Sequence, residues 1–212
     1  MSSEWQESFG DRLIGVIRLN RPVYETIKRD PRATTQALII VLFLGLATGI
    51  ALTTTSFAID TTGMDADTAA IVNEMTQALT FQTDGQKVMA LISSVLTSLV
   101  GWYITSWLLT FVGKRMSSQL GDPVTSVEVR RLVGWGYAPQ LASFLAPIPV
   151  IGAFLAFIGG IWAFVTGVMA VRTAFNVSIG RAIAIEILAF IVYVFAIFVV
   201  VILAALLLML IS

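Results

Sequence analysis

Five apolar stretches constrain the fold of this 212-residue chain more than any other feature of its sequence. They cover roughly residues 34–59, 88–112, 132–148, 150–171 and 187–211. The hydrocarbon core of a bilayer is about 30 Å thick, so a helix needs about 20 apolar residues to cross it. Four of the stretches meet this length, and the third is short. The sequence therefore predicts an all-α, polytopic integral membrane protein, built as a bundle of five transmembrane helices.

The charged residues lie mostly between the apolar stretches, and their signs alternate from one connection to the next. Basic residues precede the first stretch and follow the second and fourth: Arg12, Arg18, Arg21, Lys28, Arg29, Arg32, Lys114, Arg115, Arg130, Arg131, Arg172 and Arg181. The connection over residues 60–87 is acidic and contains only one cation, Lys87. Because short basic loops stay in the cytoplasm, the pattern predicts five crossings with the N-terminus inside and the C-terminus outside.

Several function classes are disfavoured by what the sequence lacks. It contains no cysteine and no histidine, so thiolate catalysis, disulfides and a histidine base are excluded. It has no phosphate-binding glycine loop and no nucleophile elbow. The acidic 60–87 connection lacks the ligand spacing and the glycine of an EF-hand. We therefore expect no enzymatic activity, no cofactor, no metal and no nucleic-acid partner.

Residues 1–33 are predicted to form a cytoplasmic segment distinct from a five-span domain over residues 34–212. Trp5, Phe9, Leu13 and Val16 recur at helical spacing, with Arg12 among their polar neighbours. Such an amphipathic helix suits a position at the membrane surface. The alternative is a helix that packs against the cytoplasmic loops of the protein itself. In the acidic connection, Asp65 is placed to cap a short helix.

Prolines distinguish the third apolar stretch. Pro139 interrupts it, and Pro147 and Pro149 end it in a tight turn that leads into the fourth stretch. A proline inside a helix bends the axis and frees a carbonyl, which a membrane tolerates only where neighbouring groups satisfy that carbonyl. We therefore expect a buried, kinked third helix that forms a hairpin with the fourth. The Gln140 amide is one candidate to bond the freed carbonyl, and a bond to a facing helix is another.

Small residues at helical spacing indicate where helices approach closely. The pairs and stripes are Gly45 with Gly49 in the first stretch, and Gly152, Ala156, Gly160 and Gly167 in the fourth. In lipid, close backbone contact is a main source of attraction between helices. The pattern fits packing within one chain, and it also fits a homodimer or a partner helix.

Polar residues inside the stretches leave two interpretations open. Ser94, Ser98 and Thr105 share one helical face, which with Gln140 would line a path for a polar solute or bond neighbouring helices. Glu186 precedes 25 apolar residues, Ile187–Ile211, which already suffice to cross the bilayer. We therefore expect Glu186 at the headgroups, paired with Arg181 or Arg172.

Three short motifs resemble the Yip family, the Ypt/Rab-interacting membrane proteins, in its prokaryotic form. They are PVYETIKRDP over residues 22–31, RLVGWGYAP over 131–139, and IPVIG over 148–152. The resemblance implies a five-span bundle with a cytoplasmic N-terminus and no enzymatic activity. Eukaryotic members are associated with Rab GTPases and vesicle traffic. The chain lacks the long cytoplasmic region of the eukaryotic members and the Asp-Leu-Tyr-Gly-Pro motif within that region. By this comparison we expect the protein to lie in the cell membrane of a prokaryote.

The sequence and the resemblance together predict a membrane adaptor or organiser. Its partners would be the lipid bilayer, anionic lipid, and another membrane protein or a second copy of the chain. The expected cytoplasmic contact face comprises Arg130, Arg131, Tyr137, Pro139, Arg172 and Arg181. The alternative is a small transporter or channel subunit that uses the polar path.

Overall fold

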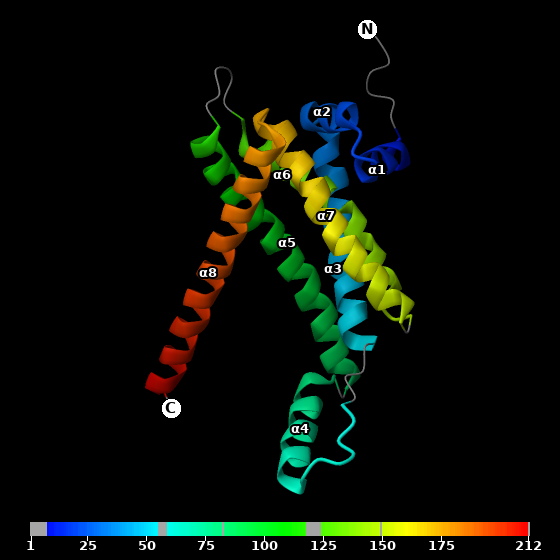
Figure 1. Ribbon diagram of the computed structural model, residues 1–212, viewed down its shortest axis with the longest axis vertical. Helices are drawn as coiled ribbons and strands as arrows, with labels where there is room; N and C mark the ends of the chain where they lie inside the picture. Colours follow the sequence, from blue (N-terminus) through cyan, green and yellow to red (C-terminus); the bar gives the residue numbers. More distant parts are fainter. Residues whose placement is uncertain (1–7, 55–58, 82, 118–123, 149, 212) are drawn as a thin grey trace.

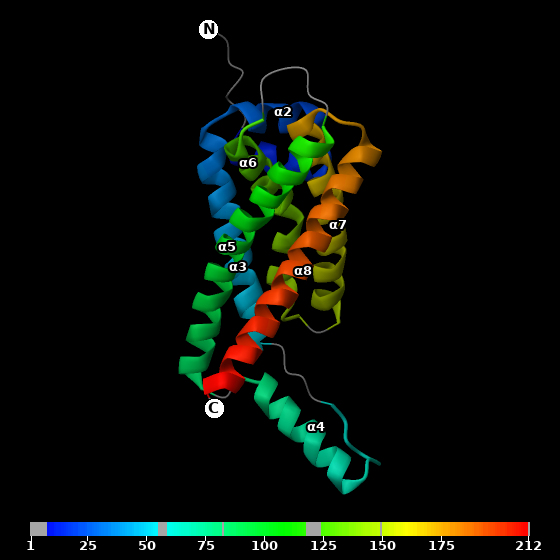
Figure 2. The same cartoon turned by 90° about the vertical axis from the view of Figure 1, so that its left-hand side faces the viewer.

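The computed structural model describes residues 8–54, 59–81, 83–117, 124–148 and 150–211. Within these ranges the secondary structure is entirely helical. The elements are α1 (Phe9–Ile17), α2 (Arg21–Arg29), α3 (Arg32–Thr54), α4 (Ala66–Leu79), α5 (Asp84–Met116), α6 (Ser126–Gly136), the 3₁₀ helix η1 (Ala138–Leu145), α7 (Ile151–Phe175) and α8 (Ile179–Ile211). Helices α2 and α4 lie at opposite ends of the elongated molecule (Figures 1 and 2).

Among the described residues, four helices are long and apolar enough to cross a membrane: α3, α5, α7 and α8. They correspond to the first, second, fourth and fifth apolar stretches. The third stretch is divided between α6 and η1, and neither reaches the length of a spanning helix. The all-α class and the multi-pass membrane character are confirmed, while the fifth crossing stays a prediction.

The break in the third stretch occurs where the sequence predicts it. Helix α6 ends at Gly136, and Pro139 falls in the first turn of η1, where its missing N–H costs no helical hydrogen bond. Helix η1 packs along α7. The Gly136 carbonyl, at the junction, accepts a 2.6 Å hydrogen bond from Thr166 Oγ1 on α7. A hydroxyl on the neighbouring helix therefore satisfies the backbone at the break.

The most extensive contact between two helices in the described residues joins α3 to α5. A Cβ added at Gly45 would lie 2.6 Å from the Val95 Cα, so only glycine fits there. Ser94 Oγ donates a 2.8 Å hydrogen bond to the Gly45 carbonyl. Gly49 also faces α5, at Leu91 and Ser94. The small pair of the first stretch is thus used within one chain.

The N-terminal helices pack against the bundle. Val16 on α1 and Tyr24 and Ile27 on α2 are buried. Trp162 on α7 donates a 2.8 Å hydrogen bond to the Ile17 carbonyl. Lys28 Nζ donates one of 2.9 Å to the Ala174 carbonyl near the end of α7. In the structure, therefore, the N-terminal helices pack against the protein itself, which is the alternative that the sequence left open. Helix α1 nevertheless has exposed apolar side chains, namely Phe9, Ile14 and Ile17.

Helix α4 has a different character. Asp65 caps it by accepting a 2.9 Å hydrogen bond from the Thr68 N–H, as the sequence predicts. Helix α4 makes no extensive contact with any other helix in the described residues, and it projects from the bundle in both views (Figures 1 and 2). Its stability therefore depends largely on local interactions.

Candidate functional site

A buried ion pair ties the N-terminal helices to the first spanning helix. Arg12 Nη2 on α1 lies 2.6 Å from Asp30 Oδ2, and both side chains are almost fully buried. Arg12 also donates a 2.9 Å hydrogen bond to Gln36 Oε1 on α3. Since a buried charge is costly unless it is paired, this pair fixes α1 against the corner between α2 and α3.

The surroundings of Asp30 favour its ionised form. Burial raises the pKa of Asp30, but hydrogen bonds from Arg12 and from the Arg32 N–H, together with the charges of both arginines, outweigh this effect. The Arg32 N–H lies 2.9 Å from Asp30 Oδ1. The pKa of Asp30 is therefore lowered from its ordinary value, and the ion pair persists at neutral pH.

Helix α6 is fixed to the same corner by a second arginine. Arg131 Nε donates a 3.0 Å hydrogen bond to Thr34 Oγ1, and Arg131 Nη1 donates to the Lys28 carbonyl. Trp135 Nε1 donates a 3.1 Å bond to the Ala33 carbonyl. Arg131 and Pro139 are both buried, so their side chains hold the helices together rather than present themselves to a partner.

The remaining residues of the expected contact face differ in accessibility. Arg130 is half-buried, and its guanidinium lies 4.1 Å from the centre of the Tyr103 ring. Arg172 is half-buried and Arg181 is exposed. Tyr137 instead lines an internal cavity.

Exposed cations gather at this end of the molecule, which we call the basic end. Within the described residues they are Arg18, Arg21, Arg29, Arg32, Lys114, Arg115 and Arg181. They come from α1, α2, the start of α3, the end of α5 and the start of α8, which Figure 1 shows together around the α2 end. The end thus presents positive charge on helices that buried bonds hold in place.

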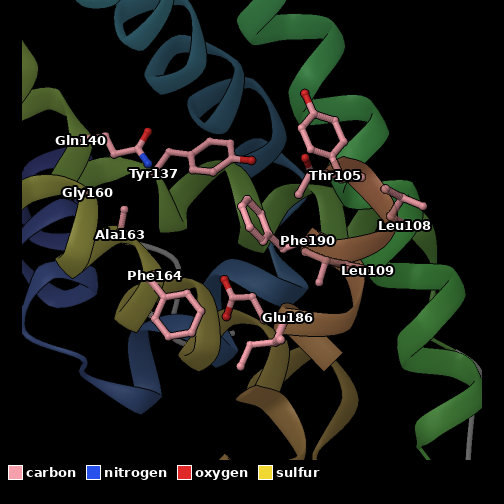
Figure 3. A pocket seen from close by; sticks show the side chains of 13 residues that line it. Thr105, Leu108, Leu109, Tyr137, Gln140, Gly160, Ala163, Phe164, Glu186 and Phe190 are labelled. Carbon is pink, nitrogen blue, oxygen red and sulfur yellow. The ribbon is translucent and has the colours of Figure 1, made fainter. Parts of the chain in front are cut away.

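A half-open cavity of about 460 Å³ lies among α5, η1, α7 and α8. Its lining is mostly apolar. The polar side chains in it are Thr105, Tyr137, Gln140, Glu186 and Tyr193, and no basic side chain is among the lining residues. Figure 3 shows Thr105, Tyr137, Gln140 and Glu186 around the same space. The volume falls within the range of small-molecule sites, which are about 300–1,000 Å³.

Glu186 is the acidic member of this cavity. Its Oε2 is buried and has no hydrogen-bond partner among the described residues. None of the ion pairs between described residues involves it. The expected pair with Arg181 or Arg172 is therefore wrong, because Glu186 points into the bundle toward Gly167, where an added Cβ would collide with its carboxylate. The missing side chain at Gly167 thus leaves space for the Glu186 carboxylate, whereas the sequence predicts that Gly167 allows close packing of helices.

The predicted polar path is divided between two cavities. Thr105 and Gln140 line the cavity beside Glu186, whereas Ser94 and Ser98 line a separate cavity near α3 and the start of α5. The two cavities share no lining residue. Because Ser94 also bonds the Gly45 carbonyl, the part of the polar face nearer the start of α5 serves helix packing.

The small residues of α7 have separate surroundings. Gly152 lies against the Leu145 and Ala146 carbonyls in the hairpin turn. Ala156 is half-buried. A Cβ added at Gly160 would meet nothing within 4 Å, whereas one added at Gly159 would lie 2.7 Å from the Pro139 carbonyl oxygen. Close packing against η1 therefore involves Gly159, one position before Gly160 of the predicted stripe.

Sequence reasoning placed Asp30 in a motif before the first span but did not predict its ion pair, and it did not single out Thr166 or Gly159. For Asp30 a signal existed, since it is an acidic residue within a basic segment that immediately precedes a proline and the first span. Thr166 has no local signal, because its partner is the Gly136 carbonyl on another helix.

The family comparison agrees with the motifs quoted above. The family model for the Yip1 domain matches residues 14–211, which includes all the spanning helices and most of the N-terminal segment. No curated protein and no solved structure gives a significant match to the chain. With nearly its whole length matched and four helices able to span a bilayer, the chain belongs to the Yip1 domain family of multi-pass membrane proteins.

Proposed function

We propose that the protein is a non-enzymatic adaptor or organiser whose basic end binds the acidic surface of a membrane-associated partner and the anionic lipid around it. The observation that carries the proposal is the set of exposed cations on helices held by buried interactions, chiefly Arg12 with Asp30 and Arg131 with Thr34. A surface that is rigid before binding loses little conformational entropy on association.

The charge distribution supports the cytoplasmic side of a prokaryotic cell membrane as the place of this surface. Short loops rich in Lys and Arg are retained in the cytoplasm, and a cation near anionic headgroups contributes about 1 kcal/mol of attraction. In the proposed topology α6 and η1 together form the third of five crossings, so the N-terminus is inside and the C-terminus outside.

Single cysteines test this topology directly, because the natural chain contains none. Exposed residues at the two ends, Arg29 and Glu74, are suitable positions. In intact cells a membrane-impermeant maleimide should label Glu74→Cys, and it should label Arg29→Cys only after the cells are opened. Labelling of Arg29→Cys in intact cells would contradict the proposed orientation.

The adaptor function is tested by purifying the tagged protein from its native membrane in mild detergent. The test variant reverses three exposed cations, Arg18→Glu, Arg21→Glu and Arg29→Glu, and leaves the buried Arg12 and Arg131 intact. Mass spectrometry should find a stoichiometric partner with the natural protein and lose it with the triple variant. Recovery of the protein alone in several detergents would contradict partner binding.

A matched control distinguishes the basic end from general charge effects. Lys87 lies at the opposite end, at the start of α5, and Lys87→Glu should retain the partner. Loss of the partner in this control would show that the basic end is not the contact surface. Circular dichroism should show equal helix content in all three proteins.

A further inference from the structure

The cavity contains an acidic side chain, Glu186, whose position the basic end does not explain. A carboxylate in mostly apolar surroundings is expensive unless a cation or hydrogen-bond donors satisfy it. Glu186 Oε2 is buried and has no partner among the described residues, and no lysine or arginine lines the cavity. Among the described residues, therefore, no group satisfies Glu186 Oε2, which leaves this oxygen available to a bound ligand.

The mouth of the cavity faces the region of the bilayer. Gly160 and Phe164 on α7, together with Ile187 and Phe190 on α8, line the cavity and are exposed. Phe164 is 44% exposed and Phe190 is 65% exposed. Both residues lie on helices that are apolar enough to span a membrane. A ligand can therefore enter from lipid between α7 and α8.

The depth of Glu186 suits a lipid headgroup. Glu186 follows Ile179, the first residue of α8, by seven positions, which corresponds to a helical rise of about 10 Å. Helix α8 has 33 residues, about 50 Å of helix, which exceeds the hydrocarbon thickness of about 30 Å. Glu186 therefore lies near the boundary between the headgroups and hydrocarbon of the leaflet on the basic side.

Beyond the cavity, toward the end of α8, apolar surface remains uncovered. Phe195, Phe198 and Leu203 are each at least 60% exposed. Helices α5 and α8 diverge in this direction (Figure 1). Acyl chains would thus find apolar surface directly below a headgroup held in the cavity.

We propose that this cavity binds the ammonium headgroup of a membrane lipid, with Glu186 as the counter-charge and Thr105, Tyr137 and Gln140 as polar neighbours. The carboxylate and hydroxyl oxygens accept hydrogen bonds from a primary ammonium. The rings of Phe164, Phe190 and Tyr137 attract an ammonium through their faces. Gly167 preserves the space that the carboxylate occupies.

Native mass spectrometry of the delipidated protein tests the proposal. The protein is given equal amounts of phosphatidylethanolamine, phosphatidylcholine and phosphatidylglycerol, and the retained lipid is identified. We expect at least one ammonium lipid to be retained over phosphatidylglycerol by about tenfold, which corresponds to about 1.4 kcal/mol. Equal retention of all three lipids would overturn the proposal. So would displacement of the bound lipid by soluble ethanolamine at the same concentration as the lipid.

Two variants separate the headgroup site from general lipid adhesion. Glu186→Gln keeps the side-chain shape and removes the charge, so the lipid preference should disappear while the protein remains folded. Gly160→Leu fills the mouth, where no atom lies within 4 Å of an added Cβ, and should block retention with Glu186 intact. The control Glu74→Gln removes an exposed carboxylate from α4 and should change nothing. An unchanged lipid profile in Glu186→Gln would overturn the assignment of Glu186.

Discussion

The two ends of the molecule are built from different kinds of interaction. At the basic end, residues far apart in the sequence are joined by buried polar contacts, such as Arg12 with Asp30 and Arg131 with the Lys28 carbonyl. At the opposite, acidic end, α4 is stabilised by its own cap, and the ion pair between Lys87 and Asp84 is exposed. The basic end is therefore part of the packed bundle, whereas α4 makes no extensive contact with the bundle in the described residues.

The largest effect should come from breaking the buried ion pair. Asp30→Asn removes the buried carboxylate that pairs with Arg12 and should lower the stability of the bundle by about 3–5 kcal/mol. Thermal unfolding in detergent, followed by circular dichroism, measures the loss. Asp84→Asn is the matched change at the acidic end, where the pair is solvent-exposed, and should leave the unfolding temperature unchanged. Equal effects of the two substitutions would remove the distinction between the ends.

A smaller effect is expected where α3 meets α5. Gly45→Ala places a Cβ 2.6 Å from the Val95 Cα, so the two helices must separate, at a cost of about 1–3 kcal/mol. The same measurement applies, and Gly180→Ala is the control because nothing lies within 4 Å of its added Cβ. A stable Gly45→Ala protein would indicate that this helix contact is not essential to the bundle.

Acid should weaken the basic end. The pKa of Asp30 is lower in the folded protein than its ordinary value. Its contribution to stability is therefore fully present above the unfolded pKa of about 3.9 and is lost as the pH falls through the folded value. Unfolding temperatures measured from pH 6 to pH 2.5 should fall more steeply for the natural protein than for Asp30→Asn. Parallel curves would show that Asp30 does not titrate as described.

The smallest effect on the bundle is expected from the acidic end. Asp65→Ala removes the side chain that accepts the Thr68 N–H, so the first turn of α4 should fray. Hydrogen exchange should accelerate over residues 66–69 and remain unchanged in α3 and α5. A change in the exchange of the spanning helices would indicate that α4 is coupled to the bundle after all.

Much of the helical framework could be predicted because it depends on neighbours in the sequence. Four spanning helices follow from the length of the apolar stretches, and the end of α6 near Pro139 follows from the chemistry of proline. The cap at Asp65 is likewise local. The candidate site was less predictable: Thr105 and Gln140 do lie in one cavity, but the pairing expected for Glu186 is wrong.

The amino-acid sequence alone indicates that the protein lies in a membrane, which family it belongs to, and that its positive and negative connections are segregated. The packing of the helices is needed to show that Arg12 and Arg131 turn inward while Arg18 and Arg29 remain exposed. It is also needed to show that Glu186 faces a cavity in which no described lining residue is basic. Hydrophobic length, caps and prolines act within one or two helical turns. The partner of a buried charge, by contrast, depends on how the helices rotate and cross, which packing between distant segments decides.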